Sequence, residues 1–394
     1  MTRILQEKVE QAIQILQELD MDLWLTFVRE TSASEDPILP LIYGHKLTWP
    51  SALILTNSGA RIAIVGRLEE DTVQRVGAYE TILTYDEGIG DLLLETIRRL
   101  DPSQIAINYS ADNVHADGLS HGMYLSLLNY LAGTAYADRL VSAEDAIAAL
   151  RGRKTRTEIT RITQAIATTE AIYQEVFDYT QPGISEIDIS TFMHSKLKEY
   201  GVDPAWELNH CPTVNVGAES PLGHVGPTDL EVKAGQLVHF DFGVRLLEYC
   251  ADIQRVMYFK AEGEDAVPET VQRGFDTIVL AIQESVHAMR PGVTGRSIDA
   301  IARSMVTNAG YPEFKYALGH QLGRAAHDGG ALLGPKWEKY GKLPDMLLEA
   351  GQIYTVEPGL MVNDYGYIGL EEDVLVTEDG CVFLTTPQTE LVVK

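Results

Sequence analysis

Residues 354–376, YTVEPGLMVNDYGYIGLEEDVLV, contain two apolar runs on either side of the turn-forming segment Asn363-Asp364-Tyr365-Gly366. A turn of this kind between apolar runs predicts a β-hairpin. Glu357 and Glu371 each lie seven residues from the centre of the turn, so the hairpin sets them opposite each other, while Glu372 points to the other face. Opposed side chains in an antiparallel pair lie roughly 4.5–5.5 Å apart. Two carboxylates at that distance repel each other, which indicates a cation between them.

A second acidic hairpin is predicted upstream, in residues 235–259, GQLVHFDFGVRLLEYCADIQRVMYF. Asp241 and Asp252 are eleven residues apart with the loop 245–248 centred between them, so they too are expected to face each other. A single acid in a strand usually marks an exposed edge, but two mirrored pairs are hard to explain in that way. Burying a carboxylate costs several kcal/mol unless it is paired or bound to a metal. Four converging carboxylates need a charge of about +4, which two divalent cations supply.

A histidine between glycines offers a fifth ligand. In Leu318-Gly319-His320-Gln321-Leu322-Gly323 the glycines allow the backbone to approach closely, although a lone histidine is more often a core residue. A site of carboxylates with one imidazole suits Mn²⁺, Co²⁺ or Fe²⁺ better than it suits a structural Zn²⁺. The sequence therefore predicts a centre for divalent metal ions.

The composition is that of a globular protein with a strong negative charge. The chain has 394 residues, of which 45% are hydrophobic, and a formal net charge of −26. This charge repels phosphates and argues against nucleic acid or an anionic membrane as a partner. Three widely spaced cysteines, Cys211, Cys250 and Cys381, indicate a reducing compartment. Because the N-terminal segment does not resemble a secretory signal and no long apolar run occurs, the expected location is the cytoplasm.

The order of the apolar segments predicts two domains with a boundary near residue 150. Before it, short apolar runs alternate with helical stretches, as expected of a small α/β domain. The basic segment Arg151-Gly152-Arg153-Lys154 has the character of a junction, and Thr155 and Glu158 form the capping box of a long helix. The second half is predicted to combine helices near 185–200, 268–290 and 297–308 with strands within 236–258 and 352–388.

The candidate ligands resemble those of a known family. Their types, order and spacing are similar to the dinuclear-metal ligands of the pita-bread metallopeptidases, which include prolidase and aminopeptidase P; these ligands are Asp241, Asp252, His320, Glu357 and Glu371. The segments NVGAESPLGHVGPTD, AGQLVHFDFG, GHQLGRAAH and TVEPG resemble the prolidase and aminopeptidase P branch. The resemblance implies a creatinase/prolidase-type α/β domain over residues 1–150, for substrate access and dimerisation, and a pita-bread α+β catalytic domain over 151–394.

The resemblance also implies the chemistry. The expected activity is hydrolysis of a peptide bond next to proline, as in an Xaa-Pro dipeptidase or Xaa-Pro aminopeptidase. The activity would require two divalent metal ions. Mn²⁺ is the preferred candidate, with Co²⁺, Fe²⁺ or Zn²⁺ as alternatives. Glu357 would pass a proton from water to the leaving nitrogen, and His224 and His327 match the two non-ligand histidines that would stabilise the oxyanion. Family members are commonly homodimers, so a homodimer is expected.

Four further residues are candidates for lining the pocket, and each has a simpler interpretation. His239 lies two residues before Asp241 on the same strand face, and His210 is a similar candidate, with packing as the alternative for both. Trp49 and Tyr43 would reach a neighbour's site in a dimer, or else they are core aromatics, which is the favoured interpretation.

Two positions depart from the family pattern and leave the substrate open. Gly369 stands where dipeptidases of this branch carry an arginine, and Gln254 replaces a threonine in Asp252-Ile-Gln254-Arg255. Longer peptides are therefore alternatives to Xaa-Pro dipeptides. Two other classes remain as alternatives: a hydrolase or lyase of a small non-peptide molecule, such as an ectoine-like amide or dimethylsulfoniopropionate, and a non-catalytic peptide-binding homologue. The complete set of ligands argues against the last of these.

Overall fold

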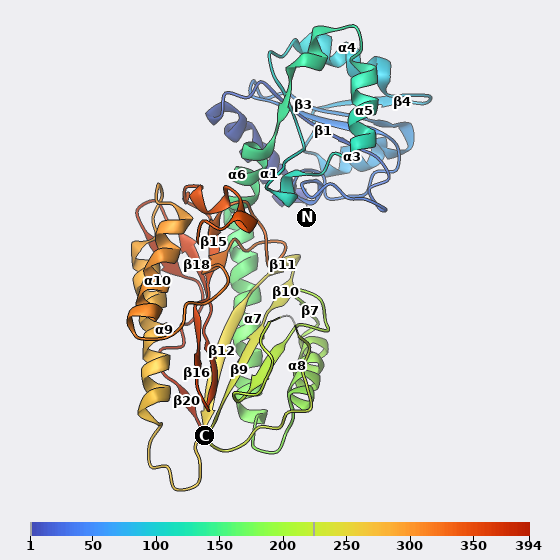
Figure 1. Cartoon of the computed structure of the whole chain (residues 1–394). Coiled ribbons are helices and arrows are strands. Elements are labelled where there is room, and N and C mark those ends of the chain that lie inside the picture. The colour runs from blue at the N-terminus through green and yellow to red at the C-terminus, as the bar shows by residue number, and fades with distance from the viewer. Residues whose placement is uncertain (1, 224) are drawn as a thin grey trace. The chain divides into compact units, whose positions relative to one another are not determined.

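The structure is a computed structural model that describes residues 2–223 and 225–394. It divides into two compact units, Met1–Arg151 and Gly152–Lys394, each with helices and strands (Figure 1). Within the described residues, every helix is too short or too polar to cross a membrane.

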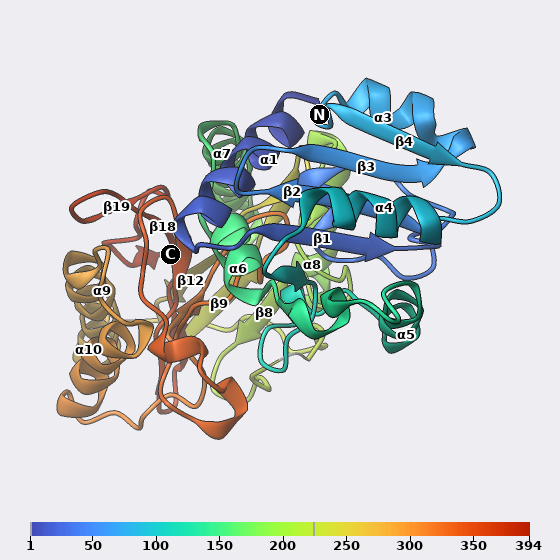
Figure 2. The same ribbon diagram turned by 90° about the horizontal axis from the view of Figure 1, so that it is seen from above.

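The first unit is built on one six-stranded mixed sheet, in the order β4-β3-β2-β1-β5-β6. Its elements are α1 (Thr2–Glu18), β1 (Leu23–Val28), α2 (Leu39–Ile42), β2 (Ser51–Thr56), β3 (Arg61–Gly66), α3 (Glu70–Val76), β4 (Thr81–Tyr85), α4 (Gly90–Leu100), β5 (Ile105–Ile107), α5 (His121–Tyr130), β6 (Leu140–Ser142) and α6 (Glu144–Gly152). Apolar side chains from β1, β2, β3 and β5 pack against α4 and α5. The ribbons of these elements are seen in Figure 2. The alternation of strands and helices predicted for this part of the chain is confirmed.

Two aromatic residues of the first unit lie in different surroundings. Tyr43 is fully buried in the core, as expected. Trp49 is 51% exposed, and its ring lies over Gly66, where an added Cβ would be 2.8 Å from the indole. The interpretation as a core aromatic is therefore confirmed for Tyr43 and wrong for Trp49, because Gly66 lets the indole rest on the backbone at the surface.

The second unit places its strands between two pairs of helices, α7 and α8 on one side and α9 and α10 on the other (Figure 1). Its helices are α7 (Arg156–Tyr179), α8 (Glu186–Tyr200), α9 (Glu269–Ala288) and α10 (Gly295–Asn308). Its strands are β7 (Asp203–Pro204), β8 (Thr213–Val216), β9 (Gln236–Phe242), β10 (Val244–Leu246), β11 (Tyr249–Cys250), β12 (Ile253–Phe259), β13 (Gly319–His320), β14 (Leu332–Leu333), β15 (Ile353–Val356), β16 (Gly359–Val362), β17 (Gly366–Gly369), β18 (Glu372–Val376), β19 (Cys381–Phe383) and β20 (Val392–Val393). The predicted helices and strand clusters are confirmed.

The strands of this unit form several small sheets. The main ones have the orders β20-β12-β9-β8 and β15-β18-β19, with β16-β17 as a separate pair. Apolar residues of α9 and α10 pack against these strands in one continuous core. On the other side, the Tyr173 hydroxyl of α7 donates to the Ile253 carbonyl at 2.6 Å, and its ring contacts Phe240 and Phe242. Helices on both sides thus hold β9 and β12 in place.

The basic segment at the boundary belongs partly to the second unit. The Arg153 guanidinium binds both carboxylate oxygens of Glu349 at 3.0 Å. Lys154 Nζ lies 3.9 Å from Asp328 Oδ2, and both side chains are almost completely buried. The same Asp328 oxygen accepts the backbone N–H of Arg324 at 2.6 Å, which closes the loop between them. The segment that the sequence marks as a junction is therefore anchored within the second unit.

Helix α7 begins with the predicted capping box. Thr155 Oγ1 accepts the Glu158 backbone N–H at 3.3 Å, and Glu158 Oε2 accepts the Thr155 backbone N–H at 2.7 Å. Thr155→Ala is expected to lower the free energy of unfolding by about 1 kcal/mol, because one N–H of the first turn loses its acceptor. Urea denaturation measures this change. Thr160→Ala, at an exposed position inside the same helix, is the control, and an equal loss there would contradict the capping role.

Candidate functional site

The hairpin of residues 354–376 pairs in the register that the sequence predicts. Val356 faces Glu372 between β15 and β18, and Gly359 faces Gly369 between β16 and β17. The same register, continued through the break between the two ladders, sets Glu357 opposite Glu371. The turn between β16 and β17 is short and contains Asp364 at a φ of 70°. The opposed pair of acids at this hairpin is therefore confirmed.

The other acidic hairpin pairs in a different register, and the prediction that Asp241 faces Asp252 is wrong. Gln254 faces Asp241 instead. The chain turns at Leu247 and Glu248, which both have positive φ values of 51° and 71°. The centre of the hairpin is therefore one residue later than predicted, and the partner of Asp241 shifts by two residues. Asp252 lies diagonally from Asp241, still close enough for the two charges to affect each other.

His320 is held at the end of a short strand that runs close to its neighbour. An added Cβ at Gly319 would lie 1.9 Å from the Thr355 carbonyl oxygen, so only glycine allows β13 to approach β15 in this way. The His320 backbone N–H donates to Thr355 Oγ1 at 3.2 Å. His320 Nδ1 lies 3.4 Å from the Gln321 carbonyl oxygen, which places the ring proton on Nδ1. Nε2 is then left with a lone pair.

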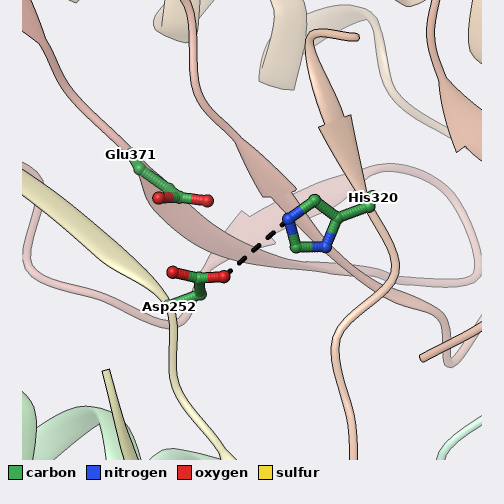
Figure 3. Close-up of side chains that lie close together, drawn as sticks. All are labelled: Asp252, His320 and Glu371. Carbon is green, nitrogen blue, oxygen red and sulfur yellow. Dashed lines mark ion pairs between the residues drawn. The ribbon is translucent and has the colours of Figure 1, made fainter. Parts of the chain in front are cut away.

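Three side chains from different segments converge around that lone pair, as Figure 3 shows for Asp252, His320 and Glu371. Their donor atoms all lie within 4.8 Å of one another. His320 Nε2 is 3.8 Å from Asp252 Oδ2 and 3.4 Å from Glu357 Oε1. Acceptor atoms that point at each other at these distances repel unless a cation lies among them. The arrangement is that of ligands around a metal ion.

The acids of the cluster have raised pKa values. Burial raises the pKa of Asp241 to about 7. Burial and then the neighbouring carboxylates hold the pKa values of Asp252, Glu357 and Glu371 well above the usual range. These shifts measure how unfavourable four charged acids are at this place without a compensating cation.

The remaining features of the cluster also fit a metal. Asp241 Oδ1 and Glu371 Oε1 are buried and have no hydrogen-bond partner within residues 2–223 and 225–394. Burial, followed by the nearby His327, lowers the pKa of His320 to about 3, so its imidazole is neutral, as a metal ligand must be. A donor set of carboxylates with one neutral imidazole suits hard divalent ions. The residues present therefore fit a divalent-metal centre.

The acids next to Glu371 have other partners. Glu372 binds the Arg255 guanidinium through both oxygens, at 3.0 and 3.1 Å, in a pair buried from solvent. Arg255 also donates to the Glu371 carbonyl oxygen at 3.0 Å. Asp373 Oδ2 accepts the backbone N–H of Asp252 at 3.3 Å. Glu372 and Asp373 thus hold the backbone of two candidate ligands in place.

The structure describes one of the two predicted non-ligand histidines and not the other. His327 is exposed, and its ring centroid lies 4.0 Å from that of His320, so the structure brings it to the cluster. His327 directly precedes Asp328 in the sequence. It therefore lies in the loop that the buried Lys154–Asp328 pair holds in place. His224 lies outside the residues that the structure describes.

Sequence reasoning singled out Gln254 as a departure from the family pattern but missed its hydrogen bond to Glu357. Gln254 Nε2 donates to Glu357 Oε2 at 3.1 Å, and Gln254 Oε1 lies 2.9 Å from His239 Nε2. His239 is buried, as the packing alternative expects, with Asn215 on its other side. The correct hairpin register would have indicated that Gln254 lies at the cluster, because it faces Asp241. His210 lies in a loop where its carbonyl accepts the Trp206 indole N–H at 2.9 Å.

The sequence is similar to peptidases. Residues 160–378, more than half of the chain, match the profile of Metallopeptidase family M24. An uncharacterized peptidase of Staphylococcus epidermidis is 30% identical over 243 residues, which are 61% of this chain. The matched part spans 65% of the length of that relative, which is less than two thirds.

Two solved structures are similar to the chain over nearly its whole length. An Xaa-Pro dipeptidase from Bacillus anthracis has a TM-score of 0.74 at 22% identity, covering 99% of this chain and 100% of its own. An X-Pro aminopeptidase from Thermotoga maritima MSB8 has a TM-score of 0.71 at 25% identity, covering 98% of this chain and 99% of its own. These likenesses confirm the predicted fold, an N-terminal α/β domain followed by a pita-bread domain.

Proposed function

Because the chain belongs to metallopeptidase family M24, we propose that it uses two divalent metal ions to release an N-terminal residue next to proline. The observation that carries the proposal is the convergence of Asp252, His320 and Glu371, whose donor atoms lie within 4.8 Å of one another. Asp241 and Glu357 complete the proposed set of ligands, because both carry raised pKa values at the same cluster. Mn²⁺ is the proposed ion, since carboxylate oxygens dominate the donor set.

The preference for proline is supported by the solved structures of the same fold. Both are named for action on Xaa-Pro substrates, one as a dipeptidase and the other as an aminopeptidase. We therefore propose peptides with proline in the second position as substrates. Dipeptides and longer peptides are distinguished by the experiment below.

Bound divalent ions would polarise the scissile carbonyl and lower the pKa of water. The proposed proton carrier is Glu357, whose Oε2 accepts from Gln254 while Oε1 faces His320 at 3.4 Å. Burial and the charge of Asp241 raise the pKa of Glu357, so its carboxylate can accept a proton from water and pass it to the leaving nitrogen. His327, exposed beside His320, is the proposed donor to the oxyanion. His224 is proposed as its companion from the sequence alone.

A peptidase assay on metal-depleted protein tests this function. We expect that adding Mn²⁺ allows release of the N-terminal residue from Gly-Pro or from Xaa-Pro-Pro peptides. The same peptides with alanine in place of proline are the controls, and they should be cleaved at least about tenfold more slowly. Faster cleavage of the tripeptide would assign an aminopeptidase, and faster cleavage of the dipeptide a dipeptidase. An absence of hydrolysis with Mn²⁺, Co²⁺, Fe²⁺ and Zn²⁺ alike would refute the proposal.

A further inference from the structure

Gly369 leaves a space that another residue fills. An added Cβ at this position would lie 2.4 Å from Gln254 Oε1 and 2.7 Å from both His239 Nε2 and Tyr367 Cε1. Real Cβ atoms do not come this close to other heavy atoms, so a larger residue at 369 and the present position of the Gln254 amide exclude each other. The two departures from the family pattern, Gly369 and Gln254, are therefore one feature of this chain.

The Gln254 side chain is held at both ends. Its Nε2 donates to Glu357 Oε2 at 3.1 Å, and its Oε1 lies 2.9 Å from His239 Nε2. A carboxylate can only accept hydrogen bonds, so the amide nitrogen must face Glu357 and the amide oxygen must face the histidine. Gln254 is 6% exposed, which leaves little room for another rotamer.

Buried polar groups continue this support away from the cluster. His239 Nδ1 lies 3.0 Å from Asn215 Oδ1, and Asn215 Nδ2 donates to Ser220 Oγ at 3.1 Å. The Ser220 hydroxyl donates in turn to Glu186 Oε1 at 2.7 Å, in the first turn of α8. All of these side chains are at least nine-tenths buried. A neutral imidazole has one N–H, so His239 donates either to Gln254 Oε1 or to Asn215 Oδ1. The Gln254 amide is thus packed among buried polar side chains that extend to α8.

We propose that Gln254 is a positioning residue for Glu357, and that Gly369 provides the space it requires. By holding Oε2, Gln254 directs the other oxygen of Glu357 toward His320, where it lies 3.4 Å from Nε2. This inference rests on the proposed function, because it assigns the support of a residue that binds metal and carries the proton. Loss of a hydrogen-bond partner that orients a metal ligand typically lowers metal affinity or activity by about 10–100-fold.

The first test replaces Gln254 with methionine, which has a similar length but cannot donate a hydrogen bond. Affinity for Mn²⁺ is measured by calorimetry on metal-depleted protein, and kcat and KM are measured on a proline peptide. For Gln254→Met we expect Mn²⁺ affinity and kcat to fall about 10–100-fold with KM nearly unchanged. Gln283→Ala, an exposed change on α9, is the control that should alter none of them. Values within threefold of the wild type for Gln254→Met would overturn the proposal.

The second test is a double-mutant cycle on Gly369→Ala and Gln254→Ala. In the wild-type background, Gly369→Ala displaces the amide, so we expect a loss of Mn²⁺ affinity similar to that of Gln254→Ala. In the Gln254→Ala background, the added methyl group no longer meets the amide. The His239 ring has lost a contact there, and the edge of the Tyr367 ring, which does not touch Glu357 through Gln254, is the remaining close neighbour. The further loss should then be less than threefold. Equal losses in both backgrounds would mean that the two positions act independently, which contradicts the proposal.

The two proposals fail in different ways. Mn²⁺ affinity is measured without any substrate, so it does not depend on the proline preference. A wild-type protein that binds Mn²⁺ but cleaves no proline peptide refutes the proposed function, and the affinities of the Gln254 variants still decide the role of Gln254. Wild-type affinity and kcat in Gln254→Met refute that role while the proposed function stands.

Discussion

Glu371→Gln is expected to lower Mn²⁺-dependent kcat/KM by about a thousandfold or more, equivalent to about 4 kcal/mol of transition-state stabilisation. The substitution keeps the size of the side chain and removes the charge from one of the three converging donors. Glu371 is 1% exposed, and one of its oxygens has no partner among the residues that the structure describes, so its carboxylate is poised for a cation. Peptidase assays over a range of Mn²⁺ concentrations measure the loss.

A matched control separates this effect from damage to the fold. Glu378→Gln makes the same chemical change a few residues later, at an exposed position, and should leave turnover unchanged. The metal-depleted Glu371→Gln protein should be at least as stable as metal-depleted wild type above pH 7, because the raised pKa of Glu371 shows that burial disfavours its charge. Turnover within tenfold of wild type would contradict the role of Glu371 as a ligand.

The second large effect is a loss of stability of the metal-depleted protein as the pH rises. Burial raises the folded pKa of Asp241 to about 7 and holds those of Asp252, Glu357 and Glu371 well above their usual range, whereas in the unfolded chain these groups titrate near pH 4. Above pH 4 the folded state therefore binds more protons than the unfolded state, and stability falls with pH. The fall is about 1.4 kcal/mol per pH unit for each carboxyl that stays protonated in the folded state.

The measurement is cleanest between pH 7.5 and 8.5. Burial lowers the pKa of His320 to about 3 and that of His239 to about 4, whereas a histidine in the unfolded chain titrates near pH 6.5, so these two residues raise the stability as the pH rises to about 7.5. Above about pH 7.5 both are neutral in the folded and the unfolded states. Over this window, the free energy of unfolding of the metal-depleted protein should fall by about 1.4 kcal/mol for each carboxyl that stays protonated in the folded state. With saturating Mn²⁺ the loss should disappear, and a similar loss with and without metal would contradict the assignment.

The sequence predicted one hairpin correctly and the other in the wrong register for a local reason. The turn between β16 and β17 contains asparagine, aspartate and glycine, which tolerate its backbone angles, so its centre could be located. The turn between β10 and β11 uses Leu247 and Glu248 at positive φ, and neither residue type marks such a turn. The error changed the partner of Asp241 and concealed the contact between Gln254 and Glu357.

The convergence of the cluster could be predicted only in part. Charge balance required a cation between Glu357 and Glu371, and this followed from one segment of sequence. No local pattern brings His320 to Asp252 across the intervening helices; only the resemblance to a known family did so. The buried chain from Gln254 through His239 to Asn215 depends on three strands meeting at one place, which sequence spacing does not reveal.

The Lys154–Asp328 pair sets a limit on how this protein can be shortened or recombined. Lys154 precedes the first residue of α7, yet its ammonium group neutralises a buried carboxylate in the loop that carries His327. A fragment or chimaera joined at Arg156 would lose that ammonium group and leave the charge of Asp328 inside the protein without it. An exchange of N-terminal domains should therefore place its splice site ahead of Arg153, so that both basic residues stay with the second unit.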